Sequence, residues 1–164
     1  TQGDLDLLHR TFITRIDRED INILINRVDH VFDYAASAVR EIELLDVAAD
    51  HWMTEMVAAL REGAAALTEG LERFRERPEQ AEPFATRARQ AEQDVESLYR
   101  DALAALFAMD ASLDELEGAN QPRVLVAFIF DRMKRREVYR HLSNAADRLA
   151  HVGESLHDLS VKYA

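Results

Sequence analysis

The residues best suited to chemistry in this chain are carboxylates spaced four positions apart. In a helix, residues i and i+4 lie on one face, so each pair would project two carboxylates side by side. Like charges at this spacing repel, and a hard cation that took an oxygen ligand from each would turn that repulsion into attraction. Six such pairs occur: Asp29/Asp33, Asp46/Asp50, Glu72/Glu76, Glu92/Glu96, Asp110/Asp114 and Glu154/Asp158.

Spacing alone does not separate a metal site from a solvated acidic face. With 31 Asp and Glu among 164 residues, random placement would give about six pairs at this spacing, which is the number observed. An acidic surface is therefore the simpler interpretation of each pair. Asp29/Asp33 and Glu92/Glu96 stand out because they lie beside apolar stripes, where packing in a bundle could bring a second helix close.

Helices must position these acids. Apolar residues recur at a spacing near 3.6 almost throughout the chain, and only five glycines and three prolines interrupt it. The pattern predicts an all-α antiparallel helical bundle forming one domain, with two halves of about 1–78 and 79–164. The expected helices cover 4–12, 18–46, 48–77, 83–109 and 122–161.

The helix expected over 18–46 has the clearest start. Asp17 is a good N-cap, and Glu19 and Asp20 place negative charge at the positive end of the helix dipole. One apolar stripe follows at helical spacing and is expected to face the core. It consists of Ile21, Leu24, Ile25, Val28, Phe32, Ala35 and Val39.

Two other stretches bear on the packing. Gly63 and Gly70 each weaken the middle of the helix expected over 48–77 by about 1 kcal/mol relative to alanine, which permits a bend there. Residues 124–130 have strand propensity, but a lone strand would have no partner in a helical chain. We therefore expect them to form buried helical turns.

Composition excludes several classes of protein. The longest apolar run, 124–130, is far shorter than the roughly 18 residues of a membrane span, and no signal-peptide pattern opens the chain. The absence of cysteine excludes disulfides and thiolate metal sites and is compatible with a cytoplasmic location. A net charge of −11 argues against nucleic acid as the main partner.

Several motifs resemble those of one family. Residues 12–21 read Phe-Ile-Thr-Arg-Ile-Asp-Arg-Glu-Asp-Ile, and residues 28–33 read Val-Asp-His-Val-Phe-Asp. Both are similar to motifs of the PhoU-like phosphate-transport accessory proteins, with Arg15 where the family usually has proline. Further similar stretches lie at 92–96, 98–107, 134–139 and 145–148.

This resemblance implies a fold and a function. The family is built as duplicated three-helix bundles, so this chain would be such a bundle with an incomplete N-terminal helix. The implied function is a non-enzymatic regulator or accessory protein of phosphate transport, of the Pit accessory type. Its partners would be a phosphate permease or the permease's regulatory machinery. We expect a cytoplasmic homo-oligomer, with association at the inner face of the cell membrane as a further option.

The resemblance also implies a metal cofactor. PhoU-like proteins bind multinuclear metal, often iron or zinc, through acid-x-x-x-Asp motifs on neighbouring helices. Asp29 and Asp33 match one such motif, and Glu92 and Glu96 match another with Glu for the usual Asp. The motif of the last helix has Ser143 before Asp147, so one carboxylate is missing and metal binding is expected to be weakened or lost.

Other interpretations stay open. A metal-dependent enzyme could use the clustered carboxylates, but it would need a complete ligand set with an open coordination position, and Ser143 argues against that. A helical adaptor without metal is the third alternative.

His30 and His141 are expected to be surface or interhelix residues. A basic cluster is either a solvated face or a contact for phosphate, an acidic partner or an anionic membrane. It contains Arg132, Lys134, Arg135, Arg136 and Arg140.

Overall fold

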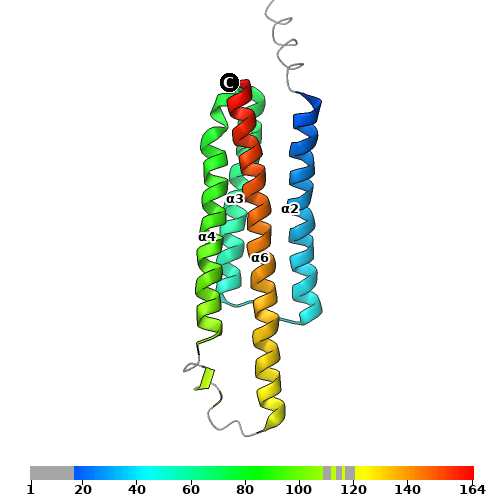
Figure 1. Ribbon diagram of the computed structural model, residues 1–164, viewed down its shortest axis with the longest axis vertical. Helices are drawn as coiled ribbons and strands as arrows, with labels where there is room; N and C mark the ends of the chain where they lie inside the picture. The colour runs from blue at the N-terminus through cyan, green and yellow to red at the C-terminus, as the bar shows by residue number, and fades with distance from the viewer. Residues whose placement is uncertain (1–16, 109–111, 114–115, 117–120) are drawn as a thin grey trace, which may run out of the picture.

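The computed structural model describes residues 17–108, 112–113, 116 and 121–164. Within these ranges the chain is all-α, which confirms the predicted fold class. Helices α3, α4 and α6 run side by side, and α2 stands at the flank of α6 (Figure 1). The elements are α2 (Arg18–Leu45), α3 (His51–Glu76), the 3-10 turn η1 (Pro78–Gln80), α4 (Glu82–Leu106) and α6 (Pro122–Tyr163).

Some predictions fall outside the described residues. These are the helix expected over 4–12, the first half of the motif that begins at Phe12, and the Asp110/Asp114 pair. The packing of α6 against α2, α3 and α4 joins the two expected halves around one shared helix. Their duplication stays a prediction, as does the incomplete N-terminal helix.

Side-chain caps set the first residues of two helices. The Asp17 carboxylate accepts a hydrogen bond of 3.1 Å from the backbone N–H of Glu19 at the start of α2. The Asp50 carboxylate accepts one of 2.9 Å from the backbone N–H of Met53. Because Asp50 satisfies a donor of the first turn, α3 begins at His51 and not at residue 48 as expected.

Glycine lets α3 approach its neighbours closely. A Cβ atom at Gly63 would lie 2.7 Å from the Cβ of Ala91, and one at Gly70 would lie 2.8 Å from the Cβ of Phe84. Both glycines are buried, and α3 continues unbroken from His51 to Glu76. The two glycines that appeared from sequence to permit a bend serve instead as contact points with α4.

The face that α2 turns toward α6 differs from the predicted one. The apolar residues that pack there include Leu24, Val28, Val31, Ala38 and Ile42. The predicted stripe shares Leu24 and Val28 with this face but is centred about 50° away around the helix, so most of it is uncovered. Phe32 is 69 % exposed, and Ile21, Ile25, Ala35 and Val39 are also exposed. The prediction that this stripe faces the core was wrong.

The start of α6 also departs from the prediction. Residues 124–130 are helical, as expected, but all except Phe128 are exposed. The Arg132 guanidinium donates a hydrogen bond of 2.5 Å to the backbone carbonyl of Leu106, the last residue of α4. Residues 122–131 therefore extend past the end of α4 (Figure 1). The expected burial of 124–130 was wrong.

Replacement of Gly63 by alanine tests the close approach of α3. Alanine is the better helix former by about 1 kcal/mol, but the added methyl group would overlap the Ala91 methyl group. Overpacking of this kind costs about 1–3 kcal/mol, so Gly63→Ala should lower the free energy of unfolding measured by denaturant titration. Gly153→Ala is the matched control, since its Cβ would lie 3.2 Å from the nearest atoms and should perturb less. A more stable Gly63→Ala variant would contradict the packing.

Candidate functional site

The structure places the first predicted metal pair on an open surface. Asp29 and Asp33 are both exposed on α2. The apolar stripe beside them is uncovered, so in the described residues no second helix is packed there to complete a ligand set. The role of Asp29 and Asp33 as metal ligands stays a prediction, and their exposed positions do not support it.

The second predicted pair meets Asp147 across the interface of α4 and α6. Burial is the main cause that raises the pKa of Glu92 above its usual value, followed by the negative charges of Asp147 and Glu96. Glu154 raises the pKa of Glu92 further, and Arg100 opposes these effects. Glu92 therefore lies within electrostatic range of two other predicted ligands, Glu96 and Asp147.

The residues around Glu96 decide what this acid cluster can do. Ser143 donates a hydrogen bond of 3.2 Å to the Oε2 atom of Glu96, and Arg100 Nε donates one of 3.0 Å to its Oε1 atom. Ser143 thus stands where the motif predicts a carboxylate, and Arg100 neutralises part of the negative charge. Among the described residues no three His, Asp or Glu side chains converge closely enough to hold a metal ion. In this arrangement the acids do not form a ligand set, and metal binding by them stays a prediction.

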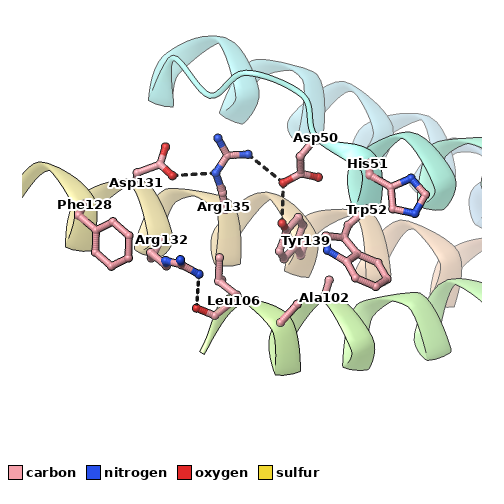
Figure 2. A pocket seen from close by; sticks show the side chains of 11 residues that line it. Asp50, His51, Trp52, Ala102, Leu106, Phe128, Asp131, Arg132, Arg135 and Tyr139 are labelled. Carbon is pink, nitrogen blue, oxygen red and sulfur yellow. Dashed lines mark hydrogen bonds and ion pairs between the residues drawn. The ribbon is translucent and has the colours of Figure 1, made fainter. Parts of the chain in front are cut away.

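A second polar constellation surrounds the start of α3 (Figure 2). The Oδ2 atom of Asp50 accepts hydrogen bonds from Tyr139 Oη at 2.6 Å and from Arg135 Nη1 at 2.8 Å. Arg135 Nε also donates to Asp131 Oδ2 at 2.7 Å, and Arg135 Nη1 to the carbonyl of Ala48 at 3.2 Å. The network ties the loop between α2 and α3 to the side of α6.

The electrostatics of this network favour the ionised forms of its salt bridge. Burial works to raise the pKa of Asp50, but hydrogen bonds from Tyr139, the Met53 backbone and Arg135 outweigh it and the pKa is lowered. Burial works to lower the pKa of Arg135, yet the bonds to Asp131 and Asp50 raise it. Burial and then Asp50 raise the pKa of Tyr139, so the phenol keeps its proton as a donor.

These residues line a hollow of about 460 Å³ beside α6. Trp52 and Phe128 line it together with Arg132, whose guanidinium carbon lies 4.5 Å from the centre of the Phe128 ring. The charged groups shown in Figure 2 are engaged with one another or with the Leu106 carbonyl. The charged side chains that line the hollow are therefore engaged in polar contacts that stabilise the fold.

Sequence reasoning identified parts of this network without their connection. Asp50 appeared as a member of an acid pair, and Arg135 as a member of the basic cluster. The available signal was Asp50 as an N-cap residue type ahead of an apolar helix, which predicts a helix start at His51 but not the burial of the carboxylate. Its partners on α6 lie 85 and 89 positions along the chain and could be found only from the packing.

The histidines agree with the simpler interpretation. His30 is exposed on α2. His141 Nε2 on α6 lies 3.9 Å from Glu41 Oε2 on α2 and is thus an interhelix residue. His157 and Glu82 pair across α6 and the start of α4.

Comparisons with protein-family models and with curated proteins find no match for this chain. The similarity to PhoU-like proteins therefore rests on the motifs at 12–21, 28–33 and the later stretches. Phosphate transport and metal binding stay predictions.

Loss of Asp50 should destabilise the fold more than loss of an ordinary cap. Asp50→Ala removes the α3 cap, worth about 1 kcal/mol, and leaves the buried Tyr139 hydroxyl unpaired, at about 1–3 kcal/mol. Asp17→Ala, which removes the exposed α2 cap, is the control and should cost only about 1 kcal/mol. Equal losses in thermal or denaturant unfolding would show that the network contributes nothing beyond capping.

The same network predicts a dependence of stability on pH. Because the folded-state pKa of Asp50 lies below its ordinary value of 3.8, its contribution is present above that value and is lost as pH falls through the folded-state pKa. The stability difference between the wild type and Asp50→Ala should thus be constant from pH 7 to about 5 and shrink below about pH 4. A difference that grew on acidification would contradict the assignment.

The acid cluster on α4 and α6 yields a prediction about metal. Ser143→Glu restores the carboxylate that the motif lacks, so added Zn²⁺ or Fe²⁺ should raise its unfolding temperature more than that of the wild type. Adding Glu92→Gln and Glu96→Gln to the Ser143→Glu variant should remove this metal-dependent rise in unfolding temperature. Glu72→Gln with Glu76→Gln changes an exposed pair on α3 and should leave it intact. If metal raised the unfolding temperature of all four proteins equally, the cluster would be only a solvated acidic face.

Proposed function

We propose that this chain is a non-enzymatic accessory or regulatory protein of phosphate transport that acts by contact with a permease or its regulatory machinery. Two observations support the proposal. The motifs at 12–21 and 28–33 resemble those of PhoU-like proteins, and the described residues form the all-α bundle that such a resemblance implies. The polar contacts around Asp50 stabilise the fold and leave no side chain of that network poised as a nucleophile.

The observation that carries the proposal is the uncovered start of α6. Along 122–133 the exposed apolar side chains occur around most of the helix circumference, with exposed fractions from 39 % to 57 %. A helix that is apolar all round is normally buried against a partner. The exposed residues are Val124, Leu125, Val126, Ile129, Phe130 and Met133.

Charge supports a partner at a membrane surface. Arg123 is exposed on this segment, and Arg136, which pairs with Glu137, is exposed just after it, in a protein whose net charge is −11. Cations beside apolar side chains suit the anionic headgroup region, where the apolar groups leave water and the guanidinium groups meet phosphate. No helix in the described residues is long and apolar enough to cross a membrane. The proposed contact is therefore peripheral, at the inner face where a permease exposes its cytoplasmic loops.

Metal is a second component of this proposal. Glu92, Glu96 and Asp147 provide oxygen donors between α4 and α6, and a bound divalent ion would relieve their mutual repulsion. A metal-free adaptor would use the same α6 surface without that ion. The metal titration of the acid cluster separates these two forms of the proposal.

The double variant Ile129→Glu with Phe130→Glu tests the α6 surface. In cells of the source organism, the tagged wild type should co-purify a phosphate permease after cross-linking, and its loss should change uptake of radiolabelled phosphate. The double variant should lose the permease and behave like the deletion, because two carboxylates oppose burial against a protein or an anionic lipid surface.

Val57→Glu is the matched control, since Val57 is 50 % exposed on α3 and lies away from the start of α6. It should keep both the co-purification and normal uptake. Unchanged phosphate uptake on deletion of the chain would contradict the proposed function. If the double variant still co-purified the permease, the contact would have to lie on another surface of the protein.

A further inference from the structure

The side of α2 next to its α6 contact carries a coiled-coil seam that the described structure leaves largely uncovered. Its apolar residues are separated alternately by four and three positions, which is the heptad pattern of a helix that packs along another helix. They are Ile21, Ile25, Val28, Phe32, Ala35, Val39 and Ile42. We call this row the α2 seam.

The seam is open because α2 packs chiefly on α6. Phe32, Val39 and Ile25 are 69 %, 56 % and 52 % exposed. Val28 and Ile42 lie at the edge shared with the α6 contact and are half-buried. Figure 1 shows α2 at the flank of α6, and the seam lies on the side of α2 next to that contact, where none of the other described helices covers it. The occupant of this seam should therefore be a second helix of similar length.

The charged residues at the two ends of the seam indicate that this second helix is α2 of another copy of the chain. Continuing the same alternation outward leads to Arg18 at one end and Asp46 at the other, and both are exposed. In an antiparallel pair of α2 helices centred near Phe32, Arg18 of one copy falls within about one turn of Asp46 of the second copy, at both ends. In a parallel pair Arg18 would face Arg18 and Asp46 would face Asp46.

The flanking positions agree with the antiparallel arrangement. Asn22 then lies near Glu43 of the second copy, and Asp29 lies near Ala36, so these two flanking positions bring no acids together. Asp33 lies next to the axis, where it approaches Asp33 of the second copy and weakens the pairing at that one point. Antiparallel helices also place opposite ends of their dipoles side by side.

We propose that the chain forms a two-fold symmetric dimer through antiparallel packing of the α2 seam of two copies, with Phe32 near the axis. The seam is self-complementary, as an isologous interface requires. The start of α6 lies outside this interface and stays available to another partner. The proposed dimer therefore does not depend on the proposed transport function, and each can be tested without the other.

Spin-label distances test the arrangement directly, because the chain has no cysteine of its own. Single labels at Asn22→Cys, Asp33→Cys and Glu43→Cys lie beside the seam. Antiparallel packing predicts a short distance between copies at position 33. At positions 22 and 43, antiparallel packing predicts that the labels of the two copies are separated along the helix axis by roughly 30 Å, which is about twenty residues at 1.5 Å each. Short distances at all three positions would show a parallel pair and overturn the proposal.

Sedimentation velocity over a concentration series tests whether the seam holds the dimer. The wild type should sediment as a dimer at concentrations at which Phe32→Glu is a monomer. Val57→Glu, an exposed site on α3, should dimerise like the wild type. A wild type that stays monomeric at every concentration overturns the proposal, and so does a Phe32→Glu variant that dimerises normally.

The end pairs give an independent check of direction. Arg18→Ala removes an attraction to Asp46 in the antiparallel dimer, so the dissociation constant should rise. In a parallel dimer the same change removes a repulsion, and the dissociation constant should fall. Arg40→Ala, outside the seam, is the matched control and should leave it unchanged. Circular dichroism shows whether each variant retains the helical fold, so that unfolding is not read as dissociation.

Discussion

The close approach of α3, α4 and α6 is the constraint on which the rest of the structure depends. Gly63 and Gly70 remove the side chains that would hold α3 away from α4. Ala85 and Ala88 on α4 are fully buried. Since small residues line these contacts, the larger side chains of α6 fill the space between the helices, and α6 can pack against α2 with its remaining face. The acid cluster between α4 and α6 and the network around Asp50 are both placed by this arrangement.

Polar contacts fix the register of α6 against its neighbours on both sides, and on the side of α2 Lys162 and Tyr163 both donate to Asp20. Asp50 meets Arg135 and Tyr139 at one end of the bundle, where its carboxylate is satisfied from both helices. On the α2 side, Arg148 stacks over the Tyr34 ring, yet its Nε atom is buried without a hydrogen-bond partner. Unpaired buried polar atoms oppose the contact that buries them. Because α2 packs chiefly on α6, whereas α3, α4 and α6 all pack on one another, α2 is the helix held least firmly.

The sequence predicts the helices well because local signals determine them. Asp17 marks the start of α2, and proline and apolar spacing mark most of the remaining boundaries, whereas the cap at Asp50 was missed and the helix was expected to begin at residue 48. What it could not predict is which face of α2 is buried. The row from Ile21 to Val39 and the row through Leu24, Val31 and Ala38 are both apolar, and only the packing of α6 chooses between them. Gly63 was misjudged for a similar reason, because helix propensity is local and the contact with Ala91 is not.

The candidate site was predictable only in part. Glu92, Glu96 and Asp147 were selected by motif and the fold does bring them near one another. Asp29 and Asp33 were selected on the same grounds, but they lie on an open face. Burial and neighbours, which decide whether a carboxylate pair is a site or a solvated surface, depend on contacts between distant segments. The network of Asp50, Arg135 and Tyr139 was missed for the same reason.

Hydrogen–deuterium exchange resolved by peptide, in protein dilute enough to be monomeric, tests the central claim that α3, α4 and α6 form the stable unit and α2 is held only at its side. Amides in the middle of α2 should exchange through openings of lower free energy than those of α4 and of α6 from Val138 to Leu156, which should exchange only on global unfolding. Equal protection of α2 and the buried part of α6 would contradict the account.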